Sequence, residues 1–356
     1  MQRLAKRKIL NKFWILYKMN GRRKEIILTG VKPTDHPHIG NYLGAIRPAL
    51  ELVSQTDQSL FFIADYHALT SVQNGKELRD YTYSVAASWL ACGLDPNKTI
   101  IYRQSDIAEI FELNWILSCF APKGLLNRAH AYKAQIQENT KEGRDDLDFG
   151  VSMGLFCYPV LMSADILLFS TDVVPVGEDQ VQHVEIARDI AQKFNRVYGN
   201  VLKLPKHFVK TEKIVPGLDG RKMSKSYGNH IPLFLESKKL RKLIMKIVTD
   251  SSPPETPKET KGSLLFDLYR EFAPAKKVEE FAQIYARGVG WGEVKELLFQ
   301  AIEDHFREPT KRYNDYMSNP DKLEAILKNG AHRARQLAQP LMSVVREKVR
   351  GFFLFS

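Results

Sequence analysis

A histidine, a glycine and an asparagine stand together where a strand should give way to a helix. They are His38, Gly40 and Asn41, in the stretch PHIGNYLGAI. The first turn of a helix exposes unpaired backbone N–H groups at its positive end, which favours a bound anion. Gly40 would let a ring or a phosphate approach the backbone, and the two polar side chains can donate hydrogen bonds to phosphate oxygens. The pattern indicates a phosphate cradle; a turn with a polar helix cap would leave the same pattern.

A second group of residues combines cations with a flexible backbone. Lys222–Ser226 reads KMSKS and follows two glycines, Gly217 and Gly220. Lysines on a mobile loop can stabilise negative charge that develops on a leaving group and can then release that group. A solvated basic loop is the alternative interpretation.

Strands and helices alternate around the cradle. Strands are expected at Glu25–Gly30, Leu60–Asp65 and Thr99–Gln104, with helices at Ile39–Val53 and Glu77–Leu94. Strands that are apolar throughout are typical of a parallel sheet covered on both faces. Ligands bind such sheets beyond the carboxyl ends of the strands. The residues expected there include Thr29, Gly30, Asp65, His67, Gln104 and Ser105.

The alternation continues in the middle of the chain. We interpret the polar stretch Gln135–Asp148 as an exposed loop or a mobile connection. A helix is expected at Tyr158–Phe169, a strand at Asp172–Val176 and a long helix at Val181–Asn195. The first of these helices carries a single acid, Asp165, among apolar neighbours.

From Pro232 onward the chain is predicted to be mostly helical. The expected helices are Leu235–Val248, Ser263–Phe272, Val278–Arg287, Gly292–Met317 and Asp321–Val349. The predicted fold class is α/β, a Rossmann-like doubly wound parallel sheet with a C-terminal helical domain. Residues 1–23 are expected to be a disordered basic arm, residues 24–231 the sheet domain ending in the KMSKS loop, and residues 232–356 the helical domain. The last helix could pack back on the sheet domain.

The charge balance indicates a polyanionic partner. The 356 residues carry a formal net charge of +11, which favours a nucleic acid or a membrane surface; an enzyme that is merely basic is the alternative. No stretch approaches the ~18 apolar residues that span a bilayer. The cysteines, Cys92, Cys119 and Cys157, are isolated, which indicates neither a metal site nor a disulfide framework. We interpret all three as core thiols in a reducing compartment.

Together, the two candidate phosphate sites resemble the signature pair of the class I aminoacyl-tRNA synthetases. Gly220–Ser226 (GRKMSKS) matches the loop motif of that family letter for letter. His38–Asn41 (HIGN) resembles its other motif, with asparagine in place of the final histidine, as in the branch that activates aromatic amino acids.

Within that branch, the middle of the chain is similar to the bacterial tryptophanyl-tRNA synthetases. The likeness extends from about Ile26 to Val349, and tyrosine-specific relatives usually have two adjacent glycines where this chain has Gly177 and Glu178. It implies a ligase that activates L-tryptophan with ATP and Mg²⁺ and transfers it to tRNA(Trp). The residues that carry it are Tyr158–Pro159, Leu161–Leu167, Val174–Gln180, His183, Glu185, Arg188 and Asp189.

Selecting tryptophan requires a particular kind of pocket. Indole offers one N–H donor and no acceptor, so a selective pocket needs a buried acceptor amid apolar walls. The resemblance implies that Asp165 accepts the indole N–H and that Tyr158 and Gln180 contact the α-amino group. For the apolar members, ordinary core packing is the alternative. The implied tryptophan site comprises Leu28, His67, Tyr158, Met162, Asp165, Ile166, Val174, Val176 and Gln180.

The resemblance also implies an ATP site. It comprises Thr29, Lys32, His38, Gly40, Asn41, Gly177, Asp179, Ile214, Lys222, Met223, Ser224 and Lys225. The carboxylate of Asp179 suits the ribose, because it accepts hydrogen bonds from sugar hydroxyls. Transition-state stabilisation is assigned to His38, Asn41, Lys222 and Lys225. The chain departs from its relatives at Lys32, where they often have glutamine, and at Gln135, where they often have lysine.

The implied partner, tRNA, is a polyanion that would use the positive charge. Ser237–Lys246 (SKKLRKLIMK) could contact it or could be a solvated helix face. Trp291 or Tyr313 could stack on bases or belong to the core. The family implies a cytoplasmic homodimer. Two alternatives remain: an enzyme of the same fold, either a tyrosyl-tRNA synthetase or a nucleotidylyltransferase, and a non-catalytic RNA-binding relative.

Overall fold

The computed structural model describes residues 25–53, 56, 58–209 and 215–351. The predicted arm at residues 1–23 and the predicted ATP residue Ile214 lie outside this part of the chain. Within it, a sheet of five parallel strands has the order β3-β2-β1-β4-β5. The strands are β1 (Ile26–Val31), β2 (Gln58–Ile63), β3 (Thr99–Arg103), β4 (Val173–Val176) and β5 (Lys206–Val209).

Both faces of the sheet are covered, as the apolar strands predict. Phe61 and Ile63 of β2 belong to one buried cluster, whereas Leu60 and Phe62 belong to the other. This alternation follows from the period of two along a strand. The strand order reverses between β1 and β4, so the carboxyl ends of these two strands border the crevice where ligands bind in such folds.

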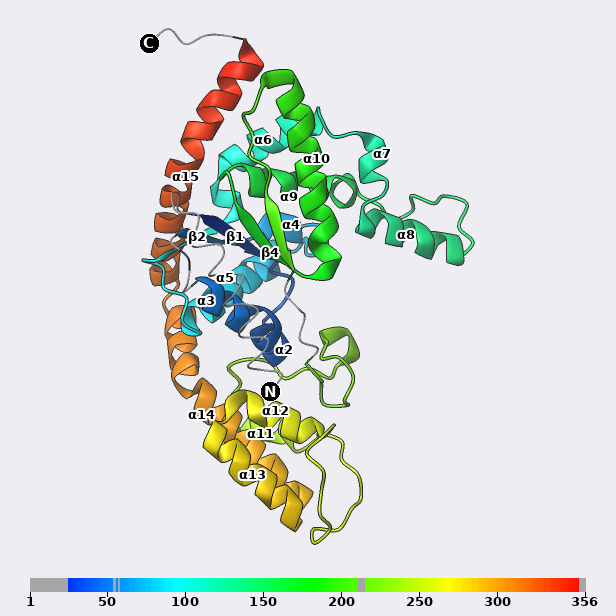
Figure 1. Cartoon of the computed structure of the whole chain (residues 1–356), viewed down its shortest axis with the longest axis vertical. Coiled ribbons are helices and arrows are strands. Elements are labelled where there is room, and N and C mark those ends of the chain that lie inside the picture. Colours follow the sequence, from blue (N-terminus) through cyan, green and yellow to red (C-terminus); the bar gives the residue numbers. More distant parts are fainter. Residues whose placement is uncertain (1–24, 54–55, 57, 210–214, 352–356) are drawn as a thin grey trace, which may run out of the picture.

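Helices flank the sheet and extend to one side of it (Figure 1). One run of them is interrupted by a π-helical turn, η1 (Tyr42–Ile46), directly after the HIGN motif. The flanking helices are α2 (Ile39–Asn41), α3 (Arg47–Val53), α4 (Asp65–Ala68), α5 (Gly75–Ala91), α6 (Ala108–Ser118), α7 (Lys123–Leu126), α8 (His130–Lys141), α9 (Met153–Leu167) and α10 (Val181–Tyr198).

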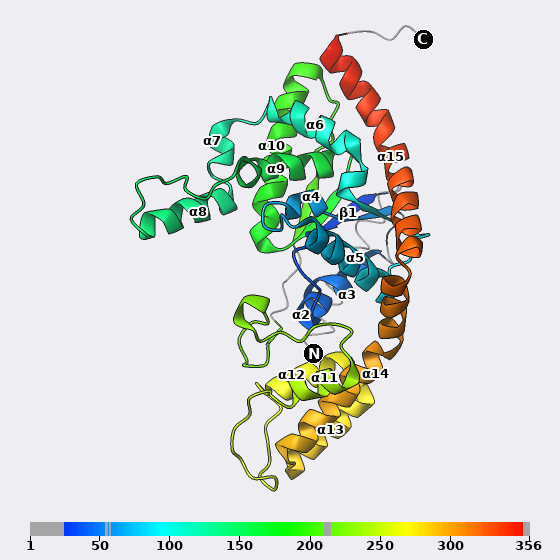
Figure 2. The same ribbon diagram turned by 180° about the vertical axis from the view of Figure 1, so that it is seen from behind.

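The remaining helices form the other end of the molecule. They are α11 (Ser237–Ile244), α12 (Leu264–Phe272), α13 (Ala275–Arg287), α14 (Trp291–Ser318) and α15 (Pro320–Arg350). Figure 2 shows α11–α13 grouped at the far end, with α14 leading back and α15 running along the sheet. The helix α15 packs against β3, α5 and α6.

One buried cluster joins the sheet helices to the C-terminal helices. It includes Leu43 and Trp89 together with Leu240, Phe281 and Leu298. This cluster contains residues from both sides of the domain boundary predicted between residues 231 and 232. The boundary therefore stays a prediction. In the described part of the chain, no helix combines the length and apolar character needed to cross a bilayer.

The predicted fold class is confirmed, and three details of the sequence interpretation are wrong. Gln135–Asp148 is not all loop, because α8 continues to Lys141. Buried Asn139 stabilises its end by donating to the carbonyls of Leu147 and Phe149, both at 2.8 Å. Cys119 is exposed and is therefore not a core thiol. No strand was expected at β5, whose side chains are mostly exposed.

Candidate active site

An apolar pocket of about 480 Å³ lies beyond the carboxyl ends of β1 and β4. Its walls include residues of β1, β2, α4, α9 and β4, which the sequence places far apart. Of the predicted tryptophan site, all residues but Asp165 line this pocket: Leu28, His67, Tyr158, Met162, Ile166, Val174, Val176 and Gln180.

Asp165 lies behind the pocket wall. Its side chain is fully buried and accepts hydrogen bonds from His67 Nε2 at 2.9 Å and from Gln104 Nε2 at 2.8 Å. Burial raises the pKa of Asp165, although the bonds from His67 and Gln104 oppose that rise. Its role as the acceptor of an indole N–H stays a prediction. The sequence indicated Gln104 only by its place after a strand, not as a partner of Asp165.

Tyr158 is held by a histidine that the sequence interpretation left without a role. The Tyr158 hydroxyl and His183 Nε2 are 2.5 Å apart. Burial raises the pKa of Tyr158 to about 12 and lowers the pKa of His183 to about 4, so both groups are neutral at pH 7. Gln180, nearby on the pocket wall, donates to Asp179 Oδ2 at 2.8 Å.

Lys32 lines the same apolar pocket. It follows β1 directly, and its Nζ donates to Thr70 Oγ1 at 2.7 Å. Burial lowers the pKa of Lys32. The predicted contact of Lys32 with ATP stays a prediction, whereas its place on the wall of the pocket is a structural fact.

The predicted phosphate cradle lies at the start of the short helix α2, where the His38 ring approaches the Gly40 backbone closely. His38 precedes α2, and its backbone N–H donates to Asn41 Oδ1 at 3.0 Å. A Cβ at Gly40 would lie 2.8 Å from the His38 ring, so a side chain at position 40 would crowd the cradle. Burial, with Lys225 and His230 nearby, lowers the pKa of His38 to about 4. The imidazole is therefore neutral at pH 7 and can donate one hydrogen bond.

The KMSKS loop is docked on this cradle. The backbone N–H of Gly40 points at Met223 Sδ, 3.2 Å away, and Met223 is buried. Lys225 Nζ lies 3.0 Å from an Asp35 carboxylate oxygen and also donates to the carbonyl of His36. The structure thus brings the two predicted phosphate-binding motifs together.

Asn229 shapes the loop, and the sequence interpretation gave it no role. It is buried, and its side-chain oxygen accepts from the Ser224 backbone N–H at 2.8 Å. Its amide nitrogen donates to Asp219 Oδ1 at 2.7 Å and to the Lys222 carbonyl at 3.2 Å. The only sequence signal is a polar residue just beyond the motif.

The other predicted ATP residues border the same region. Thr29 belongs to β1, Gly177 lines the pocket, and Asp179 lies in the turn after β4. The described residues include no group of three or more histidines, cysteines or acids that could hold a metal ion.

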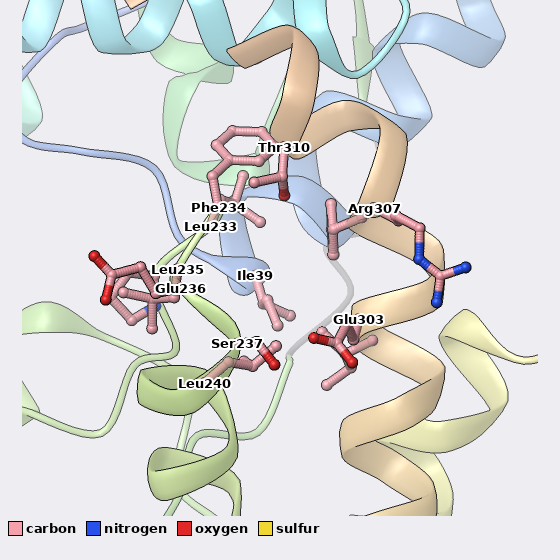
Figure 3. Close-up of a pocket in the computed structure, with 13 residues that line it drawn as sticks. Ile39, Leu233, Phe234, Leu235, Glu236, Ser237, Leu240, Glu303, Arg307 and Thr310 are labelled. Carbon is pink, nitrogen blue, oxygen red and sulfur yellow. The ribbon is translucent and has the colours of Figure 1, made fainter. Parts of the chain in front are cut away.

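A second pocket, of about 240 Å³, separates the cradle from α14 (Figure 3). Ile39, next to the cradle histidine, faces Phe234 and α14 across it. Phe234 has φ of 58°, and its ring stacks on Tyr313 at 4.4 Å between centroids. The Tyr313 hydroxyl bonds Ser84 Oγ at 2.9 Å. Its ring and hydroxyl are thus both engaged within the protein, which supports the core interpretation of Tyr313 over base stacking.

Comparisons with known proteins agree with this arrangement. Residues 19–307 match the family model for class I tRNA synthetases (W and Y). A Neisseria meningitidis tryptophan–tRNA ligase is 49% identical over 328 residues, which cover 92% of this chain and 98% of that protein. A Xanthomonas campestris tryptophan–tRNA ligase is 50% identical over 91% of this chain and 76% of its own length.

Among solved structures, tryptophanyl-tRNA synthetase from Campylobacter jejuni, complexed with ADP and tryptophan, has a TM-score of 0.84 and 43% identity. The alignment covers 91% of this chain and 99% of that one. A tyrosyl-tRNA synthetase from Archaeoglobus fulgidus shares the fold, with a TM-score of 0.60 at 16% identity. From the family model and the curated relatives, the chain belongs to the class I tRNA synthetases of the tryptophan and tyrosine group.

Proposed function

We propose that the protein is a tryptophan–tRNA ligase, which activates L-tryptophan with ATP and transfers it to tRNA(Trp). The observation that carries the proposal is an apolar pocket lined by Met162, Val174 and Val176 in a chain whose HIGN cradle and KMSKS loop are docked on each other. The relatives named tryptophan–tRNA ligase and the Campylobacter jejuni structure with ADP and tryptophan support the choice of substrates.

The first step is an in-line substitution at phosphorus. An oxygen of the tryptophan carboxylate forms a bond to the α-phosphorus of ATP, and the bond from that phosphorus to the oxygen bridging the α- and β-phosphates breaks. The electron pair leaves with pyrophosphate. In the second step, a hydroxyl of the terminal ribose of tRNA attacks the activated carbonyl and releases AMP. Positioning and charge stabilisation suffice for such transfers, so no covalent link to the enzyme is needed.

The roles of the site residues follow from their chemistry. Lys222 and Lys225 would stabilise the charge that builds on pyrophosphate, and the loop that carries them can move when the product leaves. His38 and Asn41 would donate to phosphate oxygens from the cradle. Gly40 and Met223 would flank the adenine, while Gly177 and Asp179 would contact the ribose.

Mg²⁺ would enter with ATP. The phosphate oxygens of ATP are ligands of the kind that Mg²⁺ prefers. The ion would neutralise part of the negative charge on the triphosphate, and the cationic side chains of the protein would neutralise the remainder.

Transfer RNA would bind the basic C-terminal helices. The side chains of Lys238, Lys239, Arg241 and Lys242 on α11 are exposed, as a contact with phosphates requires. The reaction is expected in the cytoplasm, where tRNA is charged.

A homodimer would cover apolar surface near the pocket. Large exposed side chains lie on α4, directly after it, on α6 and at the start of α9: Tyr66 at 45%, Leu69 at 41%, Trp115 at 73% and Met153 at 72% exposure. Contiguous exposed apolar groups mark interaction surfaces. Sedimentation of the wild type and of Trp115→Glu tests this: a dimer that becomes a monomer supports it, whereas a monomeric wild type contradicts it.

Charging of tRNA(Trp) tests the whole function. With labelled tryptophan, ATP and Mg²⁺, the protein should make acid-precipitable tryptophanyl-tRNA, and labelled tyrosine should give none. A folded protein that binds tRNA(Trp) yet charges it with neither amino acid would instead support the non-catalytic RNA-binding relative.

A further inference from the structure

Lys32 is a cation on the wall of an apolar pocket, and its side chain is exposed. Its Nζ donates to the Thr70 hydroxyl, and the pocket that it lines also includes Leu28, Phe62 and Ile166. Among the described residues, no carboxylate forms an ion pair with it, and the lowering of its pKa is attributed to burial alone. A lysine that lines a ligand pocket can make a charge-assisted hydrogen bond to an anionic group of the ligand.

The position of Lys32 determines which part of a ligand it would meet. Lys32 comes directly after β1, while Gly177 comes directly after the neighbouring strand β4. Tyr158 and Gln180, the predicted contacts of the α-amino group, line the same pocket. The polar groups of this pocket therefore suit both charges of an amino acid: a cation for the carboxylate, and a hydroxyl and an amide for the ammonium group.

We propose that Lys32 binds the α-carboxylate of the amino acid substrate and so selects indoles that carry an anionic group. The proposal rests on the proposed function and refines it. Thr70 holds the ammonium group of Lys32 in place through the 2.7 Å bond to Oγ1, and Thr70 Oγ1 in turn donates to the His67 carbonyl at 2.9 Å. When the carboxylate attacks phosphorus, the same cation faces the acyl phosphate that forms.

The binding of three indole compounds can distinguish a contact of Lys32 with the substrate carboxylate from a contact of Lys32 with the phosphates of ATP. Tryptophan and indole-3-propionate carry the carboxylate, whereas tryptamine lacks it. Their equilibrium binding to the full chain would be measured by calorimetry without ATP, together with the KM values for tryptophan and ATP in pyrophosphate exchange. In Lys32→Met, binding of tryptophan and indole-3-propionate should weaken roughly 10- to 100-fold, the range expected for a charged hydrogen bond, while tryptamine binding stays the same. The KM for ATP should change less than the KM for tryptophan.

Two further variants keep the test decisive. Lys32→Arg retains the cation and should retain the preference for carboxylates, while Thr70→Val should weaken it only in part. Lys98→Met is the matched control, because Lys98 is exposed just before β3, away from the carboxyl ends of the strands. An equal loss for all three indoles, or a rise confined to the KM for ATP, would overturn the proposal.

Failure of the proposed function would be visible separately. It would appear as absent pyrophosphate exchange in the wild type, whereas the role of Lys32 is still measured by the binding of the three indoles.

Discussion

Lys225, the second lysine of the KMSKS loop, is paired with Asp35, a residue of the loop after β1. Their charged atoms are 3.0 Å apart, and the side chains are 26% and 43% exposed. The triphosphate of ATP carries several negative charges, so it would compete with this single carboxylate for the lysine. The docked loop also places Met223 against Gly40, where adenine is expected. ATP would thus have to displace both contacts.

Asp35→Asn should therefore lower the KM for ATP in pyrophosphate exchange, without lowering kcat. The ion pair is partly exposed, and pairs of this kind contribute up to about 1 kcal/mol, so the expected change is about two- to fivefold. Asparagine keeps the acceptor for the His36 backbone N–H. Asp304→Asn, on exposed α14 surface, is the control. An unchanged or higher KM for ATP would mean that Asp35 helps to place the lysine rather than competing for it.

Asp165→Asn should raise the KM for tryptophan about tenfold or more and should weaken discrimination against tyrosine. The side-chain amide of the asparagine would place an N–H donor against the Gln104 Nε2 donor. The substitution would also remove the negative charge of the Asp165 carboxylate. The leftover donor should also lower the free energy of unfolding by about 1–3 kcal/mol. Exchange kinetics with both amino acids, alongside thermal melts, separate the two effects. If the melting temperature falls while tryptophan selection is unchanged, Asp165 is a structural residue only.

Gly330→Ala should strongly destabilise the protein. A Cβ at Gly330 would lie 1.6 Å from the Ile101 carbonyl oxygen, because α15 packs directly on β3 at this point. Overpacking of this kind costs about 1–3 kcal/mol or more. Gly292→Ala on α14 is the matched control: nothing lies within 4 Å, and alanine should stabilise the helix by about 0.5–1 kcal/mol. Equal melting temperatures for the two variants would contradict the close packing of α15.

Stability should fall as the pH decreases from about 6.5 towards 4. His183 has a pKa of about 4 in the folded protein and an ordinary value of 6.5. In this window the unfolded chain binds the proton first, so stability is lost as the pH falls. His38 adds to the same trend. Melting temperatures measured between pH 7.5 and 5 should decline less steeply for His183→Gln than for the wild type. Parallel declines would show that His183 titrates normally in the folded state.

Much of the fold was predictable because apolar strands and periodic helices are local signals. Ile26–Val31 and Val181–Tyr198 form elements close to those expected. The strand Lys206–Val209 was missed because its residues are mostly exposed and lack the buried run of a central strand. The helix α8 was missed because its face is polar and its end depends on Asn139.

The candidate site was predictable in its composition but not in its contacts. Motifs indicate residue types, whereas the partners of Asp165 come from positions 61 and 98 residues away. The pairing of Lys225 with Asp35 likewise requires the loop to fold back on the cradle. The place of Lys32 on the wall of the apolar pocket could not be read from its neighbours in sequence.

Amino-acid-dependent exchange of labelled pyrophosphate into ATP is the most direct test of tryptophan activation. Wild type and the double variant Lys222→Ala/Lys225→Ala would be assayed with Mg²⁺ and either tryptophan or tyrosine. We predict exchange with tryptophan alone, reduced at least a hundredfold in the double variant, since the loss of a preorganised charged donor costs about that much. Exchange driven by tyrosine would contradict the assignment of the pocket, and no exchange with either amino acid would contradict the enzymatic function itself.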